Sequence, residues 1–335
     1  MSAKRVIMAA VESLKMLGGT RIPAFGLGTW QSKPGEVGAA VEVALKAGYR
    51  HLDCAHIYQN EAEIGEALQK CFNEGVCKRE NLFVTSKLWA GDMEEQYVLP
   101  AIQLTLKNLQ LDYLDLYLIH SPFAFRHNLD MSNLQEVDKL GYDESRIAGI
   151  WKGMEDVLGK GLTRAIGISN LTITKTESLL KTAKIVPAVN QVECHPYFQQ
   201  KKLREYCDTK GILIEAYAPL GSPARRGVEA TDPVVMDDPT IKEIASKKGA
   251  TPAQICISFL LHRGFVVIPK SVTPHRIQEN FEATKVSLTK DEVEALVAVD
   301  KNLRLFKNFT LFLPKGTTID EIFDVEADEK FVIQS

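Results

Sequence analysis

The chain has 335 residues, a formal net charge of −3 and 45% hydrophobic residues. This length allows one large barrel or two ordinary domains, and the composition excludes a largely disordered chain. The small net charge gives no general attraction to nucleic acid or to anionic membranes, and no apolar run reaches the ~20 residues of a membrane helix. We therefore expect a protein that acts on a small molecule, without a nucleic-acid or membrane partner.

Six cysteines are scattered along the sequence without a C-x-x-C spacing. Several lie in apolar patterns, which is typical of reduced, buried thiols in a cytoplasmic protein. Neither Cys194-His195 nor the pair His51 and His56 has the spacing of zinc ligands, so no metal site is predicted. Residues 1–12 contain too short an apolar stretch for a signal peptide. We expect them to form a short tail that precedes a single domain, 13–335.

In chain order, residues 14–22 predict a β-hairpin that turns at two glycines and could close the N-terminal mouth of a barrel. Short apolar runs then alternate with amphipathic segments. The first of these segments, 37–45, has apolar residues at helical spacing, and Gly48 stands where a helix C-cap glycine is expected. A later helix opens with Pro252 at its first position. The eight candidate strands are 25–29, 51–55, 82–87, 114–120, 164–169, 188–193, 212–218 and 266–270.

Strands that alternate with helices favour parallel pairing, and eight units at a spacing of about 25–35 residues predict an α/β fold of the (β/α)8, or TIM barrel, type. A doubly wound sheet is the alternative. It is disfavoured because the stretch that begins at Gly26-Leu27-Gly28 has Gln31 where the third glycine of a dinucleotide-binding G-x-G-x-x-G belongs.

Three long segments are expected at the C-terminal face of the barrel. Segments 121–145 and 221–239 are irregular and follow the ends of predicted strands, where a barrel builds its active site. Residues 300–335 have weak periodicity, and we expect them to form a C-terminal loop and tail near that site.

Four ionisable residues, Asp53, Tyr58, Lys87 and His120, stand near the ends of successive strands, about one βα unit apart. A phenol is a poor acid at neutral pH, but a nearby ammonium stabilises the phenolate, so Lys87 is expected to lower the pKa of Tyr58. Asp53 would keep Lys87 charged, and a neutral His120 could donate a hydrogen bond to a carbonyl substrate. Each residue alone is more often structural than catalytic. Together they predict a carbonyl-reducing proton relay.

These residues lie within motifs that resemble the aldo-keto reductases, most nearly the aldose/aldehyde reductase branch. The similarity runs in order from about residue 14 to residue 300. It is carried by residues 26–30, 48–61, 86–89, 114–120, 165–170, 190–197 and 268–273. The resemblance implies an NADPH-dependent reductase of aldehydes, and of ketones as a second class, on a TIM barrel. In it, Tyr58 acts as the acid, Lys87 and Asp53 tune it, and His120 orients the substrate.

The resemblance also implies the cofactor and substrate contacts. Ser169, Asn170 and Gln191 match side chains that hold the nicotinamide carboxamide, and Tyr217 matches the ring that stacks on it. Lys270 and Arg276 also place two cations, with a hydroxyl, around one spot. This combination suits a 2′-phosphate and favours NADPH over NADH. The full cofactor-binding set is Thr29, Trp30, Asp53, Ser169, Asn170, Gln191, Tyr217, Leu220, Ser222, Lys270, Ser271, Val272, Thr273, Arg276, Glu279 and Asn280. The substrate pocket is expected to consist of Trp30, Tyr58, Trp89, His120 and Ser121.

The chain departs from the family pattern at several positions. Ser121 stands where a tryptophan usually follows the catalytic histidine, which would widen and polarise one pocket wall. Gln31 and Ala224 replace a lysine and an aspartate that close a belt over the cofactor pyrophosphate. Arg225 and Arg226 are candidates to compensate by gripping the pyrophosphate. Residues 303–335 also differ, in a segment that normally sets substrate specificity.

Two other classes of function remain open on the same fold. One is a cofactor-binding regulatory or crystallin-like structural protein without significant turnover, against which the complete set of four residues argues. The other is a Schiff-base aldolase, for which Lys87 or Lys270 would be the reactive lysine. A monomer is expected in each case.

Overall fold

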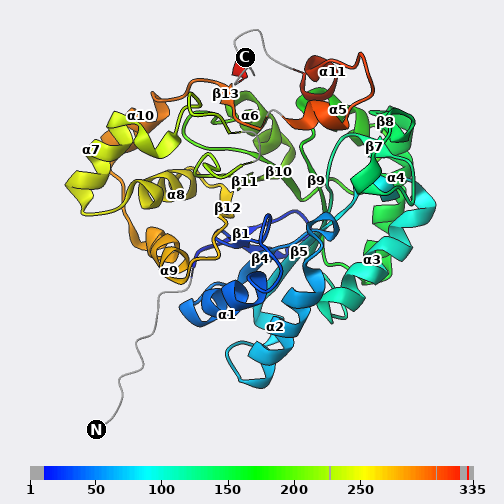
Figure 1. The fold of residues 1–335 in the computed structure, drawn as a ribbon, viewed down its shortest axis with the longest axis horizontal. Helices are drawn as coiled ribbons and strands as arrows, with labels where there is room; N and C mark the ends of the chain where they lie inside the picture. The colour runs from blue at the N-terminus through cyan, green and yellow to red at the C-terminus, as the bar shows by residue number, and fades with distance from the viewer. Residues whose placement is uncertain (1–10, 226–227, 307, 325–329, 332–335) are drawn as a thin grey trace.

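A computed structural model of the chain describes residues 11–225, 228–306, 308–324 and 330–331. Eight parallel strands within these residues form one sheet, in the order β12-β11-β10-β9-β6-β5-β4-β3. The sheet closes on itself, because Phe25 forms a parallel bridge with Val267 and Gly28 forms one with Lys270. The predicted (β/α)8 barrel is therefore confirmed, with the helices around the outside of the sheet (Figure 1).

The barrel strands coincide with the eight predicted runs; seven are shorter than predicted, and β5 has the predicted length but is shifted by one residue. They are β3 (Leu27–Gly28), β4 (His51–Asp53), β5 (Phe83–Leu88), β6 (Leu116–Ile119), β9 (Ile166–Ser169), β10 (Val189–Glu193), β11 (Leu213–Tyr217) and β12 (Val266–Val267). The helices are α1 (Val37–Ala47), α2 (Glu61–Asn73), α3 (Glu95–Leu109), α4 (Glu144–Gly159), α5 (Ile173–Leu180), α6 (Lys201–Lys210), α7 (Pro239–Lys248), α8 (Pro252–His262), α9 (Pro274–Glu282), α10 (Lys290–Val297) and α11 (Ile319–Phe323).

Local sequence signals explain where these helices begin and end. Helix α1 ends at Gly48, whose φ of 109° is a left-handed conformation that glycine adopts without strain. Helix α8 begins after Thr251, which forms a capping box with Gln254, and has Pro252 at its first position. Two helices, α7 and α8, separate β11 from β12, so this unit carries one helix more than the simple alternation predicts.

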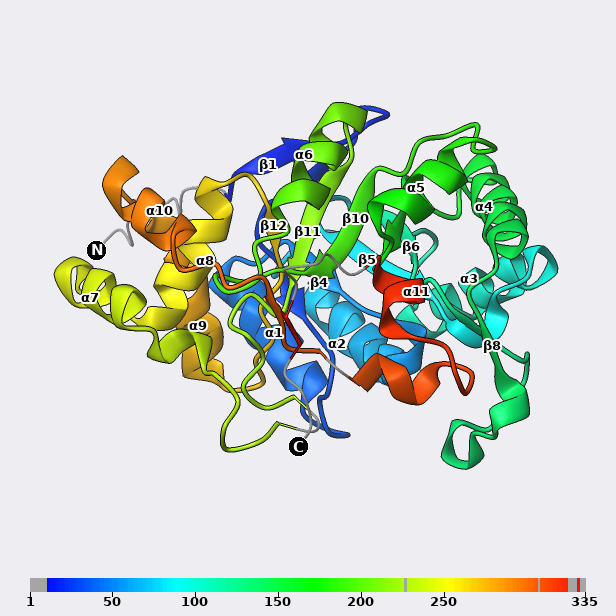
Figure 2. The ribbon, with the colours of Figure 1, turned by 90° about the horizontal axis from the view of Figure 1, so that it is seen from above.

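The predicted hairpin is present as β1 (Ser13–Lys15) and β2 (Arg21–Pro23). Its side chains Met16 and Ile22 are buried in one apolar cluster with Phe83, Leu116 and other residues from the beginnings of the barrel strands. The hairpin thus closes the N-terminal mouth of the barrel. Figure 2 shows β1 at one end of the molecule and α11 and β8 (Lys139–Gly141) toward the other.

The long segment after β6 is more regular than we predicted. Within 121–145, β7 (Ala124–Phe125) pairs antiparallel with β8. An apolar cluster joins this small sheet to the C-terminal segment through Phe125, Leu313 and Ile322. The described residues of segment 221–239, which leave out 226 and 227, are irregular as predicted, apart from the 3-10 turn Val235–Asp237 and the first residue of α7.

The C-terminal segment has a short parallel pairing between β13 (Leu303–Arg304) and β14 (Lys330–Phe331). Of the predicted N-terminal tail, residues 1–10 lie outside the described residues, as do 325–329 and 332–335 of the expected C-terminal tail. The single domain 13–335 stays a prediction. None of the described helices is both long and apolar enough to cross a bilayer.

Candidate active site

A buried lysine stands at the centre of the predicted catalytic group, near the C-terminal ends of β4 and β5. Lys87 donates to Asp53 Oδ1 at 2.6 Å and to the Cys54 carbonyl at 2.9 Å, and its Nζ lies 3.4 Å from Tyr58 Oη. Register explains the meeting of the two charged residues. Asp53 pairs with Thr85 across the β4–β5 ladder, so Lys87 stands two residues further toward the same end and on the same face of the sheet.

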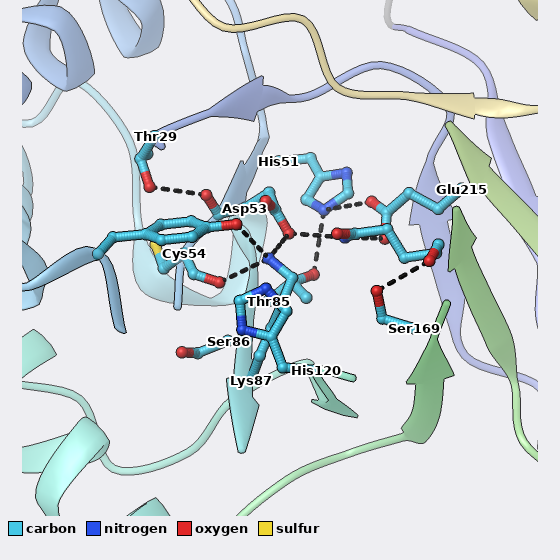
Figure 3. Close-up of polar contacts among 12 residues, drawn as sticks. Thr29, His51, Asp53, Cys54, Thr85, Ser86, Lys87, His120, Ser169 and Glu215 are labelled. Atoms are coloured by element: carbon cyan, nitrogen blue, oxygen red, sulfur yellow. Dashed lines mark hydrogen bonds and ion pairs between the residues drawn. The ribbon is translucent and has the colours of Figure 1, made fainter. Parts of the chain in front are cut away.

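The charge on Lys87 is stabilised although its side chain is fully buried. Desolvation acts to lower the pKa of Lys87, but the charges of Asp53 and Tyr58 outweigh it and raise that pKa above its usual range. A buried ammonium is tolerated here because a carboxylate and a carbonyl oxygen accept its hydrogen bonds. Figure 3 shows Lys87 between Asp53 and Cys54.

Tyr58 departs from the expected electrostatics. It ends the 3-10 turn His56–Tyr58, which brings its hydroxyl to Lys87. Burial raises the pKa of Tyr58 to about 12, and the opposing effect of Lys87 only reduces this rise. Lys87 thus lowers the pKa of Tyr58 as expected, but the net shift is upward, because desolvation exceeds the attraction of a single ammonium. A phenol with this pKa keeps its proton at neutral pH, and Lys87 remains in position to stabilise the phenolate when it forms.

His120 follows β6 and faces Tyr58 edge-on, with ring centroids 5.8 Å apart. Burial, together with the charge of Lys87, holds the pKa of His120 well below its usual value, so its imidazole is neutral. Its Nδ1 has no hydrogen-bond partner among the described residues. A neutral ring with an unused nitrogen beside the phenol can bind a carbonyl oxygen.

The residues matched to the nicotinamide site form one connected network beside this group. Ser169 Oγ donates to the backbone carbonyl of Gln191 at 2.8 Å, and Asn170 Nδ2 donates to Ser169 Oγ at 3.1 Å. Tyr217 Oη in turn donates to Asn170 Oδ1 at 2.9 Å. Gln191 Nε2 donates to Asp53 Oδ1 at 2.8 Å, which connects this network to the catalytic lysine.

The structure places the remaining cofactor candidates in two groups. Thr29 and Trp30 follow β3, where Thr29 Oγ1 donates to the Asp53 carbonyl at 2.8 Å. The set matched to the adenosine end lies after β12 and along α9, with Arg276 exposed and Asn280 buried. Thr251 Oγ1 donates to the Glu279 carboxylate, which is thereby held against the start of α8. The second group comprises Lys270, Ser271, Val272, Thr273, Arg276, Glu279 and Asn280.

The loop after β11 is held by contacts of its own. Arg225 is 4% exposed, and its guanidinium binds Asp232 and the carbonyls of Gly221 and Ser222. It does not project as a free cation, so the expectation that Arg225 grips the pyrophosphate is not supported. Arg226, the other candidate, lies outside the described residues. On the other side, Lys270 Nζ donates to the Gln31 carbonyl at 3.0 Å. Leu220, at the beginning of this loop, packs against the core.

Aromatic rings line the approach to Tyr58 and His120. Trp89 lies 6.1 Å from the His120 ring and 5.7 Å from Phe125, by centroids. Ser121 is buried, and its hydroxyl donates to the Phe123 carbonyl at 3.0 Å. This hydroxyl is engaged by the protein, which argues against the polar wall expected from the serine.

Phe306, which the sequence did not reveal, closes the other side of the approach. Its ring lies 5.7 Å from Trp30 and 5.5 Å from Tyr217, by centroids. Glu193, at the end of β10, fixes this segment by accepting from Leu305 N at 2.6 Å and from Phe306 N at 3.2 Å. No periodic pattern marks Phe306. The signal for Glu193 was a charged residue in a strand predicted to be buried.

The chain is similar in sequence to one protein family and to several of its members. The model of the Aldo/keto reductase family matches residues 23–301. The chain is 44% identical over 297 residues to aldo-keto reductase family 1 member A1 of Gallus gallus, which covers 88% of this chain and 91% of that protein. It is 45% identical over 288 residues to an aldo/keto reductase of Synechocystis, covering 85% of this chain and 88% of the relative.

A solved structure is similar over nearly the whole chain. The aldose reductase of Schistosoma japonicum superposes with a TM-score of 0.80 at 40% identity, covering 97% of this chain and 100% of that one. Among the described residues, no group of three or more His, Cys, Asp or Glu side chains is arranged to hold a metal ion.

Proposed function

This chain belongs to the aldo/keto reductase family, and on that premise we propose that it is an NADPH-dependent reductase of aldehydes, with ketones as a second substrate class. One observation carries the proposal. A buried ammonium, Lys87 Nζ, lies 2.6 Å from Asp53 Oδ1 and 3.4 Å from Tyr58 Oη. That geometry supports a proton donor whose conjugate base is stabilised only when it forms.

Tyr58 is the proposed proton donor to the carbonyl oxygen. Its phenol keeps the proton before the reaction, because burial holds its pKa at about 12. As the oxygen of the substrate gains negative charge, the proton leaves Tyr58 Oη, and the resulting phenolate is paired with Lys87. Asp53 keeps Lys87 in place, and the neutral ring of His120 holds the carbonyl oxygen in line with the phenol.

The residues around this group fit a nicotinamide dinucleotide. When bound, the nicotinamide would supply the hydride. Gln191 commits its side-chain amide nitrogen to Asp53 and Glu215, which leaves its side-chain carbonyl oxygen as an acceptor for a carboxamide. Tyr217 would offer one ring face, and Ser169 and Asn170 the adjoining polar atoms. For the 2′-phosphate of NADPH we propose two cations, Lys270 in the segment after β12 and Arg276 in the first turn of α9.

The walls of the approach support aldehydes with an apolar or aromatic substituent. Trp89 packs on His120 and Phe125, Phe306 packs on Trp30 and Tyr217, and the Ser121 hydroxyl is already bonded within the protein. Aromatic rings stabilise an apolar group by burying it and by edge-to-face contacts. The name of the Schistosoma japonicum relative, aldose reductase, adds sugar aldehydes as a class to be tested.

We also propose that the protein acts as a monomer in the cytoplasm. All six cysteines are buried and unpaired, which suits a reducing compartment.

NADPH oxidation, followed by absorbance with a panel of aromatic, aliphatic and sugar aldehydes and ketones, tests the proposal. We expect turnover with NADPH, higher kcat/KM for aromatic aldehydes than for small aliphatic ones, and a much weaker reaction with NADH. If the cofactor binds with undetectable turnover on every substrate, the chain is a cofactor-binding protein of this fold instead. Borohydride trapping of a substrate on a lysine would indicate an aldolase.

A further inference from the structure

A second acid–base pair lies inside the barrel, behind the catalytic lysine. Glu215 on β11 and His51 on β4 are both fully buried, and Glu215 Oε1 lies 3.5 Å from His51 Nε2. His51 Nε2 also lies 3.1 Å from Thr85 Oγ1. Figure 3 shows His51 and Glu215 facing each other across the barrel interior. None of the roles assigned to the four catalytic residues uses this pair.

Two positions in the sequence, Gly26 and Glu215, account for the presence of this pair inside the barrel. A Cβ atom at Gly26 would lie 2.8 Å from His51 Cγ, so the absence of a side chain there allows the ring to enter the barrel. Glu215 interrupts the apolar run Ile212-Leu213-Ile214, where a charged residue is costly unless it has a partner. The histidine and the carboxyl group are therefore held next to each other, away from solvent, inside the closed sheet.

The charges around Glu215 require a proton on this pair. The titratable groups that face it among the described residues are Asp53 and His51 on β4 and Lys87 on β5. Lys87 is the one permanent cation, and it is already paired with Asp53 at 2.6 Å. A second carboxylate would leave a net negative charge in a dry interior, which is strongly unfavourable.

Burial decides which partner holds the proton at neutral pH. Desolvation, opposed by the Pro23 carbonyl and aided by the charge of Lys87, lowers the pKa of His51 to about 3. Desolvation, followed by the charge of Asp53, raises the pKa of Glu215 to about 8. Glu215 is therefore the protonated member, with Oε1 facing the neutral imidazole, and the proton is lost at alkaline pH.

A bridging amide connects the pair to the reaction. Gln191 Nε2 donates to Glu215 Oε2 at 2.9 Å and to Asp53 Oδ1 at 2.8 Å. When Glu215 loses its proton, a second negative charge appears beside Asp53, in a medium of low dielectric constant. This charge disfavours formation of a phenolate on Tyr58, because Lys87 must then balance two carboxylates before it can stabilise a third anion.

We propose that Glu215 and His51 share one proton inside the barrel, and that carbonyl reduction slows at alkaline pH when this proton is lost, because the new charge acts through Gln191 on the Asp53–Lys87 pair. Glu215 is in this sense a positioning residue, because it contacts neither the substrate nor the reacting atoms. The effect on the rate rests on the proposed function, whereas the shared proton does not.

The pH dependence of kcat for aldehyde reduction at saturating NADPH tests the effect on the rate. In the wild-type protein, kcat is expected to fall roughly three- to tenfold between about pH 7 and pH 10. Glu215→Gln keeps the shape and the amide contact without a titratable group, so its profile should stay level to higher pH while matching wild type near neutrality. Asp115→Asn, which removes a carboxylate bound to Arg79 away from the site, is the control and should keep the wild-type profile.

If Glu215→Gln lowers kcat by the same factor at every pH, Glu215 is only structural and the proposal is overturned. If Glu215→Gln does not fold, Glu215→Thr replaces it in the same comparison.

Infrared difference spectroscopy between about pH 6.5 and pH 10 tests the shared proton without any turnover. The wild-type protein should lose the carbonyl stretch of a protonated carboxyl group over this range, and Glu215→Gln should lack this band. A wild-type spectrum without the band, or a band that persists in Glu215→Gln, would overturn the proposal. If the band behaves as expected but no aldehyde is reduced, the shared proton stands and the proposed function fails.

Discussion

The C-terminal wall of the site depends on one buried carboxylate, and Glu193→Gln should loosen it. Glu193 accepts from Leu305 N at 2.6 Å and from Phe306 N at 3.2 Å, and His195 Nε2 lies 3.0 Å from its Oε1. Desolvation acts to raise the pKa of Glu193, but these contacts and the charge of Arg304 lower it on balance, so the residue is a carboxylate. Glutamine keeps the shape of the side chain but offers only one acceptor oxygen.

Hydrogen bonds to a charged group contribute about 1.5–3 kcal/mol each, so losing one of them should weaken docking of Phe306 roughly ten- to a hundredfold. Phe306 contacts Trp30 and Tyr217 and has no assigned proton-transfer role. We therefore expect the KM for aromatic aldehydes to rise about tenfold in Glu193→Gln, with kcat within about twofold of wild type.

Steady-state kinetics with an aromatic and a small aliphatic aldehyde provide the assay, since the small substrate should be affected less. Glu292→Gln is the matched control. Its carboxylate also accepts from a backbone N–H, that of Thr289 at 2.7 Å, but at the start of α10. An unchanged KM in Glu193→Gln, or equal losses for both substrates, would refute the reasoning that Glu193 acts through Phe306.

Three further predictions concern the cofactor site, the barrel interior and the loop after β11. Arg276→Ala should weaken NADPH binding roughly ten- to a hundredfold and leave NADH nearly unaffected, measured by fluorescence titration; equal losses would make the residue structural. Gly26→Ala should reduce the free energy of unfolding by about 1–3 kcal/mol, because its Cβ would meet His51. Gly149→Ala, with open space in α4, should stabilise the protein by about 0.5–1 kcal/mol, and denaturant titration distinguishes the two. Because Gln31 and Ala224 stand where the family pattern has a lysine and an aspartate, these two positions cannot form an ion pair. We therefore expect 4-deuterated NADPH to give an isotope effect on kcat well above unity; a value near unity with slow NADP⁺ release would contradict this.

The barrel and its catalytic group could be predicted because both depend on regular spacing. Strands about 25–35 residues apart favour a parallel sheet, which eight such units can close into a barrel, and residues at successive strand ends then meet at one face. That reasoning placed Asp53, Tyr58, Lys87 and His120 together, and the structure brings them within contact. Their catalytic roles stay a prediction until they are measured.

Three features of the structure do not follow from the spacing of strands and helices, and the sequence did not predict them. Phe306 lies in a segment without periodicity, and its position depends on a distant carboxylate at the end of β10. The small sheet of β7 and β8 was missed because strands of two and three residues give no alternation to read. The pKa of Tyr58 was misjudged because the depth of burial is a property of the packed site and not of the sequence.

The rate of aldehyde reduction by Tyr58→Phe, with NADPH binding measured in the same protein, tests the central claim most directly. Phenylalanine keeps the ring and removes only the proton that Tyr58 is proposed to donate. We expect kcat to fall by about 10²–10⁴, with the Kd for NADPH nearly unchanged, because general acid catalysis typically contributes this much. Retention of more than about a tenth of the wild-type kcat would contradict the assignment of Tyr58 as the proton donor.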